Sequence, residues 1–133
     1  MLEAEAVQLS QIGQIAVPVH DVARATAFYR DALGLRLLFE APGPLAFFDA
    51  GGVRLMLSLP SDEAQDHPAS ILYFRVADIG EAHRQLGARG VAFSQPPHKV
   101  AELGTHELWL AFFEDGEGST HALMAEVAVA ARD

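Results

Sequence analysis

The chain has 133 residues, 50% of them hydrophobic, and carries a formal charge of −9 because 18 Asp and Glu outnumber 9 Lys and Arg. This length suits one domain with its own core, and the acidic balance excludes the basic surface that a nucleic-acid partner requires. The chain contains no cysteine, which excludes disulfides, thiolate nucleophiles and cysteine-ligated metals.

The apolar content also bears on location and self-association. No apolar run reaches the length of a membrane span, and the acidic residues 1–5 lack the pattern of a signal peptide. We therefore expect a cytoplasmic protein without a membrane partner. A hydrophobic content of 50% exceeds what a small monomer with a fully wetted surface needs, so we expect a homodimer interface to bury the excess.

The first half of the chain predicts the order strand, helix, strand, strand, strand. Residues 1–11 show no firm period and are interpreted as a tail or a short exchangeable element. Residues 14–19 alternate as a half-buried strand does, and Pro18 favours a sheet edge because proline lacks an amide donor. Asp21 is a good N-cap, and apolar residues at helical spacing lead from it to a stop at Gly34. Three further strands are predicted at residues 35–39, 45–48 and 53–59.

The second half repeats this order. Its helix is predicted to begin at Asp78 and to end before Gly90. Strands are predicted at residues 71–76, 91–93, 106–113 and 119–127, with a long loop at about 94–105.

The repeat is visible in the sequence itself. Residues 14–21 and 71–78 share one pattern 57 positions apart (71 − 14), and Leu45-Ala46-Phe47-Phe48 recurs literally as Leu110-Ala111-Phe112-Phe113. We therefore predict a single domain over residues 1–133. Its parts are module one at about 12–60, a connector at 61–69 and module two at about 70–127.

Four segments carry a resemblance to a known superfamily. They are Val19-His20-Asp21 followed by Ala27-Phe28-Tyr29-Arg30-Asp31-Ala32-Leu33-Gly34-Leu35, then Phe74-Arg75-Val76-Ala77-Asp78-Ile79, and Phe112-Phe113-Glu114-Asp115-Gly116-Glu117-Gly118. Together they make the chain resemble the vicinal oxygen chelate superfamily, which includes glyoxalases, bleomycin resistance proteins and extradiol dioxygenases. The resemblance implies an α+β fold in which two paired β-α-β-β-β modules form a curved, cup-shaped mixed sheet with the helices on its outer face.

The resemblance also implies where a metal would be held. Metal-dependent members place four ligands inside the cup, on the first and last strands of each module, drawn from His, Glu and Gln. The matching positions here are Gln14, Met56, Ile71 and Ala122, of which only Gln14 offers an oxygen donor. We therefore expect no metal at these positions and no cofactor.

Strand alternation predicts which side chains line the cup if Gln14 faces into it. The inward set is largely apolar with a few polar groups, which is the composition of a small-molecule pocket. The candidate ligand-binding residues are Gln14, Arg54, Met56, Tyr73, Arg75, His98, His106 and Met124.

Two of these residues, Arg54 and Arg75, each have two interpretations. An arginine on a concave sheet face could clamp a ligand carboxylate or phosphate with two parallel hydrogen bonds. It could instead pair with an acid such as Glu40 or Asp49, or open to solvent at a strand end. Tyr73 could likewise bind a ligand or the backbone.

The histidines are equally open. His98 and His106 bracket part of the long second-module loop and, with Glu102 or Glu107, could form a metal or acid/base site. Their loose spacing does not require one. His121 is expected to face away from Gln14 and to be structural or solvated.

These patterns favour a metal-free homodimer that binds a small organic molecule in the cup, as in drug sequestration by the bleomycin resistance type. The alternative is a metal-dependent lyase, isomerase or dioxygenase that uses Gln14 with His98, His106 or Glu102 around a divalent ion. If the protein is an enzyme, a glyoxalase-like lyase or a dioxygenase is expected. A third possibility is an accessory or regulatory domain with a vestigial cup and a functional dimer surface.

Overall fold

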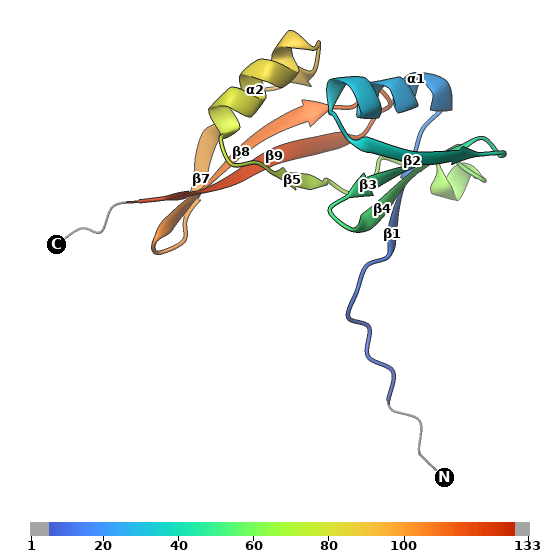
Figure 1. Ribbon diagram of the computed structural model, residues 1–133, viewed down its shortest axis with the longest axis horizontal. Helices are drawn as coiled ribbons and strands as arrows, with labels where there is room; N and C mark the ends of the chain where they lie inside the picture. The colour runs from blue at the N-terminus through green and yellow to red at the C-terminus, as the bar shows by residue number, and fades with distance from the viewer. Residues whose placement is uncertain (1–5, 130–133) are drawn as a thin grey trace.

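The computed structural model describes residues 6–129 as two units of similar order (Figure 1). The first unit, module one, has one sheet in the order β1-β4-β3-β2, and module two has a second sheet in the order β5-β9-β8-β6 with β7 also paired to β8. Module one comprises β1 (Gln14–Pro18), α1 (Val22–Ala27), η1 (Phe28–Ala32), β2 (Arg36–Ala41), β3 (Leu45–Ala50) and β4 (Val53–Ser58). The connector holds one short turn, η2 (Glu63–Gln65). Module two comprises β5 (Tyr73–Arg75), α2 (Ile79–Ala88), β6 (Ala92–Phe93), β7 (His98–Glu102), β8 (His106–Glu114) and β9 (Thr120–Ala128).

Both helices begin at the predicted caps. The Asp21 carboxylate accepts a hydrogen bond from the Arg24 amide at 3.0 Å, and the Asp78 carboxylate accepts one from the Glu81 amide at 3.0 Å. Such bonds satisfy amides at the helix start that have no partner within the helix. Each helical segment is followed by a glycine with a positive φ angle, 78° at Gly34 and 93° at Gly90.

The first helix differs from the prediction in its last turn. It is α-helical only to Ala27 and continues as the π-helical turn η1, in which the Leu33 amide bonds to the Phe28 carbonyl five residues back. A π turn inserts one residue into the helical repeat and so rotates the side chains within it. The turn η1 places Tyr29 in the core, where its side chain is fully buried.

Alternation along the strands separates a core face from an open face in each sheet. In module one the parallel pair β1 and β4 aligns Gln14 with Arg54 on one face, while Val17 and Leu57 on the other face are buried beneath α1. Module two repeats the arrangement, with Leu123 in its core under α2 and Tyr73 aligned with Ala122 on the opposite face. The predicted parity of these strands is confirmed.

The loop predicted at about 94–105 is wrong in part, because residues 98–102 form β7. This strand pairs antiparallel with β8, with His98 opposite Leu110. A bulge at Val100 shifts the register, so side chains do not alternate regularly along β7 and its sequence shows no clean alternation. The strand predicted at 71–76 is also shorter, and Ile71 precedes it.

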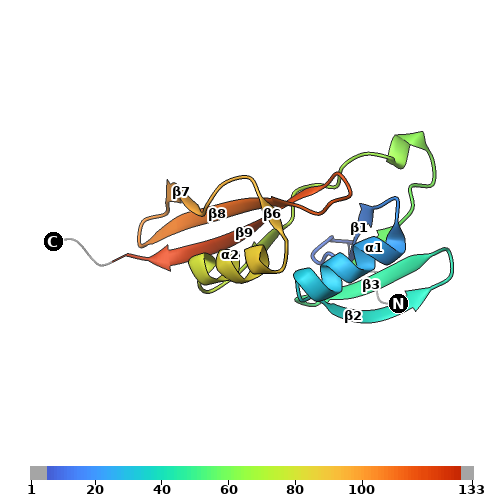
Figure 2. The same cartoon turned by 90° about the horizontal axis from the view of Figure 1, so that it is seen from above.

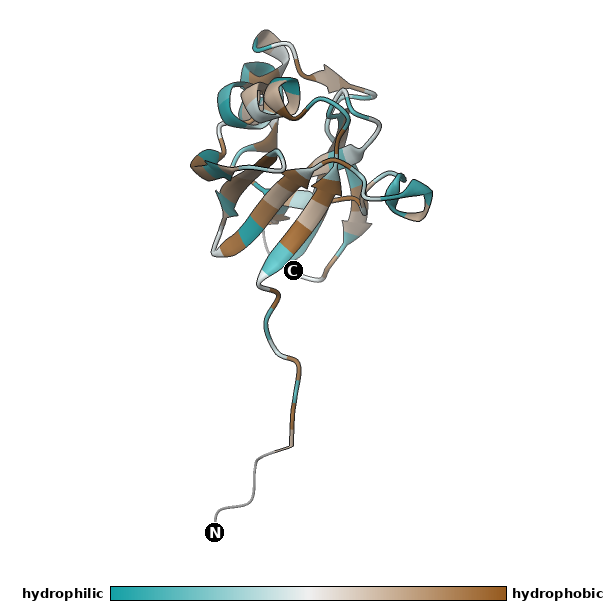
Figure 3. Ribbon diagram, turned by 90° about the vertical axis from the view of Figure 1, so that its right-hand side faces the viewer, coloured by the Kyte–Doolittle hydropathy of each residue, from teal (hydrophilic) through white to brown (hydrophobic). Residues whose placement is uncertain are grey.

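The two sheets lie side by side with both helices on the same side (Figures 1 and 2). Phe28 and Leu33 pack against both hydrophobic cores, so the end of the first helix is shared between the modules. The result is an α+β fold with open curved sheets and helices on the outer face, as predicted. Residues 6–13 run away from the sheets as an extended arm (Figure 3). Within residues 6–129, neither helix combines the length and apolar composition that a bilayer-spanning segment needs.

Candidate binding face

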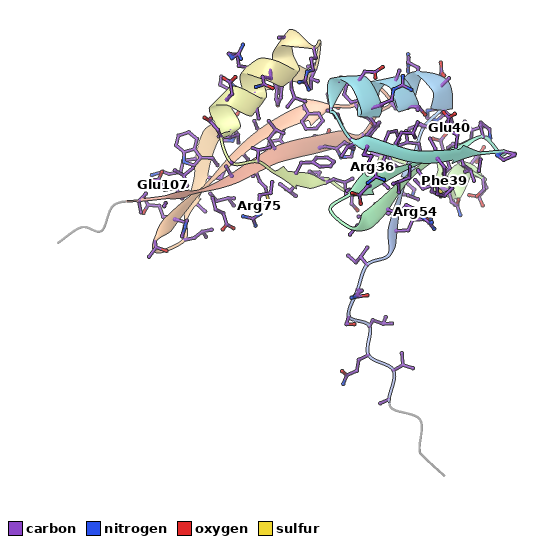
Figure 4. All side chains as sticks on the ribbon, viewed as in Figure 1. Arg36, Phe39, Glu40, Arg54, Arg75 and Glu107 are labelled. Atoms are coloured by element: carbon purple, nitrogen blue, oxygen red, sulfur yellow. The ribbon has the colours of Figure 1, made fainter. Side chains whose placement is uncertain are left out.

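The candidate site is the sheet surface opposite α1 and α2, which we call the open face. Register places Gln14, Arg54 and Met56 on its module-one part, and Tyr73 and Met124 on its module-two part. Arg75 and the module-two strands continue the same surface, and Figure 4 shows Arg54 and Arg75 projecting on the side away from the helices. These predicted residues therefore share one face of the molecule.

A fixed cluster occupies the module-one part of this face. The Arg54 Nε donates to the Gln14 Oε1 at 2.8 Å, and the Gln14 Nε2 contacts the Met56 sulfur at 3.6 Å. The Arg54 guanidinium carbon lies 5.0 Å from the centre of the Phe47 ring, within the range of a cation–π contact. Phe39 stacks on Phe47 with ring centres 4.5 Å apart. We call these five residues the Arg54 cluster.

The predicted acidic partners of Arg54 do not bind it. Glu40 is aligned with the buried Ala46, which places it on the helix side of the sheet, as Figure 4 also shows. Asp49 is aligned with Arg54, but its Oδ1 accepts the Gly52 amide at 3.0 Å in the hairpin turn. Within residues 6–129 no carboxylate lies within 4.0 Å of the Arg54 guanidinium.

Arg75 behaves differently. Its Nη1 lies 3.6 Å from the Glu126 carboxylate on β9, an ion pair in which both side chains are more than one-third exposed. Tyr73 beside it is 48% exposed and meets the Phe112 ring edge-on, with ring centres 6.2 Å apart. The module-two part is therefore aromatic, with its arginine already paired.

The two predicted loop histidines do not converge. His98 is aligned with Leu110, four residues along β8 from His106, a distance of about 13 Å at the usual strand rise. The His98 Nδ1 lies 3.2 Å from the Pro96 carbonyl oxygen, and the His106 Nδ1 lies 2.8 Å from the Thr105 hydroxyl. They do not form a shared metal or acid/base site.

A small apolar hollow of about 240 Å³ lies at the seam between the sheets. Its wall comes from β1, β4, the end of β3, and β5 with the two residues before it, and it includes Ile15, Leu55 and Tyr73. Pockets for drug-sized molecules usually reach roughly 300–1,000 Å³, so this hollow alone is small for such a ligand.

A buried polar junction, which the sequence did not reveal, holds the modules together. The Tyr29 hydroxyl donates to the Asp115 Oδ2 at 2.7 Å and lies 2.8 Å from the His121 Nε2. The Asp115 Oδ1 accepts the Glu117 and Ser119 amides at 2.7 and 3.0 Å. All four polar side chains, those of Tyr29, Asp115, Ser119 and His121, are buried, so this junction is structural and has no access to a ligand.

A second contact between modules surrounds Glu117. Its carboxylate accepts the His20 amide at 2.9 Å and the Arg24 Nη2 at 2.8 Å. Burial alone would raise the pKa of Glu117, but the His20 amide and the Arg24 guanidinium outweigh it and hold that pKa below its ordinary value. The His20 ring also lies 2.8 Å from the Asp66 carboxylate in the connector.

A profile of the Glyoxalase/Bleomycin resistance protein/Dioxygenase superfamily matches residues 11–123. The chain belongs to this superfamily. A glyoxylase-like domain-containing protein of Didymella fabae is 30% identical over 127 residues, which cover 85% of this chain and 91% of the relative.

Solved structures of the superfamily have the same fold. One member from Sphaerobacter thermophilus is 25% identical, with a TM-score of 0.74 over 89% of this chain and 98% of that one. TnmS3, an antibiotic binding protein from a Streptomyces species, is 24% identical, with a TM-score of 0.72 over 91% and 99% of the two chains. A lactoylglutathione lyase from Agrobacterium tumefaciens is 23% identical, with a TM-score of 0.69 over 89% and 95%. A binding protein and an enzyme thus share this fold.

The metal positions implied by the superfamily resemblance do not fit a divalent ion in this chain. Gln14 and Met56 meet each other, Ile71 lies outside β5, and Ala122 has no donor atom. One amide and one thioether do not make the donor set that hard or borderline cations require. Among residues 6–129 no group of three or more His, Asp or Glu side chains could hold a metal elsewhere.

Proposed function

We propose that this superfamily member is a metal-free binding protein that holds a small organic molecule on its open face. The observation that carries the proposal is the composition of that face. Its aromatic and apolar side chains surround a few polar groups, which include the Arg75–Glu126 ion pair but no metal-ligand set within residues 6–129. Such a surface suits retention of a ligand better than chemical conversion.

The TnmS3 neighbour, named as an antibiotic binding protein, supports this reading as an analogy of fold. Sequestration of a toxic or antibiotic molecule is the biological role that follows from it. The lactoylglutathione lyase neighbour supports the competing proposal of a metal-dependent enzyme. We favour binding because Met56, Ile71 and Ala122 stand at positions where that chemistry needs ligands.

We further infer that two copies of the chain complete the site. The open face exposes large apolar side chains, with Phe39 47% and Tyr73 48% accessible, and the seam hollow is small. The arm at residues 6–13 adds Val7 and Leu9 at 87% and 98% exposure, two positions apart as on one face of a strand. Apolar surface of this kind indicates a protein partner, and a second copy would bind the arm and close over the open face with the ligand held between the two chains.

Metal analysis and a ligand screen test the function. We expect purified protein without stoichiometric metal, and no rise in Tm when Ni, Zn, Mn or Fe salts are added after chelation. Native mass spectrometry against a library of flat organic molecules should detect one-to-one retention. Met56→Glu, which puts a charge on the open face, should abolish that retention, whereas Arg84→Glu on the outer helix should preserve it.

Stoichiometric metal together with a metal-dependent rise in Tm would refute the metal-free proposal and favour the lyase or dioxygenase alternative. Retention that survives Met56→Glu would place the ligand elsewhere on the molecule.

A further inference from the structure

We propose that the module-one part of the open face selects flat aromatic molecules that carry a carboxylate or a similar planar anion. This inference rests on the proposed binding function and adds the chemical class of the ligand. It depends on the Arg54 cluster, in which a guanidinium without a carboxylate partner among residues 6–129 stands beside a stacked pair of phenyl rings.

The rings form the apolar half of the site. Phe47 is buried and Phe39 is stacked on it at an angle of 25° between ring planes, while Phe39 itself is 47% exposed. The buried ring therefore holds the outer ring in place. Aromatic ligands gain from offset stacking or edge contacts with such a ring, and a flat molecule makes more of these contacts than a puckered one.

The guanidinium forms the charged half. Gln14 accepts the Arg54 Nε–H, and the guanidinium carbon lies 5.0 Å from the centre of the Phe47 ring, so two contacts orient the guanidinium. Neither terminal nitrogen of Arg54 makes a hydrogen bond within residues 6–129. Two parallel N–H donors with a fixed orientation match the two oxygens of a carboxylate.

The local charge favours an anion although the whole chain is acidic. One row across β2, β3 and β4 aligns Arg36, Asp49 and Arg54. This row holds two positive charges and one negative charge. Asp49 turns one of its oxygens toward the Gly52 amide in the hairpin turn. In a chain with a formal charge of −9, this row is a local excess of positive charge on the open face.

Module two lacks the same combination. Arg75 is its counterpart on the open face, but the Glu126 carboxylate lies 3.6 Å from its guanidinium. A ligand anion would have to displace that carboxylate. Because Arg75 has a competing carboxylate and Arg54 has none among residues 6–129, we place the ligand anion on module one.

Paired probes of equal shape test the charge preference. Isothermal titration of the full chain at neutral pH would compare 2-naphthoate with 2-naphthamide, which differ in charge, and with cyclohexanecarboxylate, which is an anion without a flat ring. We expect 2-naphthoate to bind roughly tenfold more tightly than 2-naphthamide, the size of one good charge-assisted hydrogen-bond pair. Cyclohexanecarboxylate should bind more weakly than 2-naphthoate.

Arg54→Gln should reduce the ratio between 2-naphthoate and 2-naphthamide to about one while leaving the binding of 2-naphthamide within about twofold, because only the charged contact is lost. Arg84→Gln, which removes an exposed positive charge on α2, is the charge-matched control and should keep the wild-type ratio. Circular dichroism of each variant checks that the fold is intact.

Equal binding of the two naphthyl probes by the wild type would overturn the inference and leave the proposed binding function standing. Loss of the preference in Arg75→Gln but not in Arg54→Gln would also overturn it. Failure of every flat probe to bind, in this titration and in the native mass spectrometry screen, would refute the inference and the proposed function together.

Discussion

At the scale of single residues, the buried junction has a defined arrangement of protons. The Leu72 amide donates to the His121 Nδ1 at 3.3 Å, so the proton of the neutral ring lies on Nε2. That Nε2–H faces the Tyr29 oxygen, and the Tyr29 hydroxyl in turn donates to Asp115. Each donor therefore meets an acceptor, which is the condition for burying such groups without a large cost.

This arrangement makes stability depend on pH through His121. Burial lowers the pKa of His121, and the nearby Asp115 and Glu114 carboxylates only partly oppose it. Below about pH 6.5 His121 therefore becomes protonated in the unfolded chain but stays neutral in the folded chain until a lower pH is reached. The free energy of unfolding should fall as pH decreases from that point, by at most about 1.4 kcal/mol per pH unit from this group.

Urea denaturation from pH 7.5 to 5 measures this dependence. His121→Gln should have a lower stability throughout and a shallower slope below pH 6.5 than the wild type. His67→Gln, at an exposed position in the connector, is the control and should keep the wild-type slope. An unchanged slope in His121→Gln would show that other groups cause the pH dependence.

Sequence reasoning placed Gln14, Arg54 and Tyr73 on one face because strand alternation is a local rule. It did not connect Tyr29 with Asp115 and His121, since those residues are 86 and 92 positions away from it and the contact depends on how the modules pack. Tyr29 and Asp115 both stand in the segments that carry the superfamily resemblance, and His121 was expected to be structural or solvated, but neither signal indicated the contact. Of the alternatives left open for Arg54, pairing with Glu40 or Asp49 is not the one found, because Glu40 lies on the other face and Asp49 caps its own turn; the side chain is exposed and bonds to Gln14.

At the scale of elements, Glu117 joins the β8–β9 turn to the start of α1. Its side chain is 2% exposed and binds the His20 amide and the Arg24 guanidinium. Hydrogen bonds to a buried charged group contribute about 1.5–3 kcal/mol, more than a pair at the surface. This contact should therefore hold the β8–β9 turn against the start of α1 and contribute measurably to the free energy of unfolding.

Glu117→Gln keeps the shape of the side chain and removes its charge, and we expect it to lower the free energy of unfolding by about 1–3 kcal/mol. The matched control is Glu81→Gln on α2, which breaks an exposed pair with Arg84 and should have little effect. Because the pKa of Glu117 is lowered in the folded state, its contribution is present above the unfolded pKa and lost as pH falls toward the folded pKa. Equal effects of the two substitutions in urea denaturation at pH 7.5 would contradict this account.

Helix starts and stops were predictable because caps and glycines act within one turn of the chain. The π turn at η1 was not, since the same apolar spacing fits an α-helix; in the structure this turn carries Tyr29, which bonds to Asp115 in the other module. The strand β7 was missed because its bulge at Val100 breaks the alternation on which strand prediction depends.

At the scale of the whole molecule, the arm and the open face predict self-association. Light scattering after size-exclusion chromatography should give about twice the chain mass of 14.3 kDa, with dissociation on dilution. Val7→Asp with Leu9→Asp should shift the equilibrium toward monomer, because both side chains would lose their apolar contacts with the second copy. Gln8→Asp with Ser10→Asp adds the same charge to the other face of the arm and should leave the dimer intact.

A wild-type chain that stays monomeric at all concentrations would remove the second copy from the proposal. Equal dissociation by both pairs of substitutions would instead indicate charge repulsion without a specific role for Val7 and Leu9.

The way in which the two modules dock has a consequence for the segment that joins them. Residues 59–72 join the modules, while the contacts that hold the modules to each other come from Tyr29, Glu117 and their partners. This segment also reaches the interface, through the Asp66 carboxylate beside His20 and the Leu72 amide on His121, whereas the Tyr29–Asp115 and Arg24–Glu117 contacts join residues of the two modules themselves. A shorter link would prevent the two halves of one chain from meeting, and the same surfaces would then join halves of neighbouring chains. We therefore expect the length of residues 59–72 to determine whether the modules dock within one molecule or between two exchanged chains.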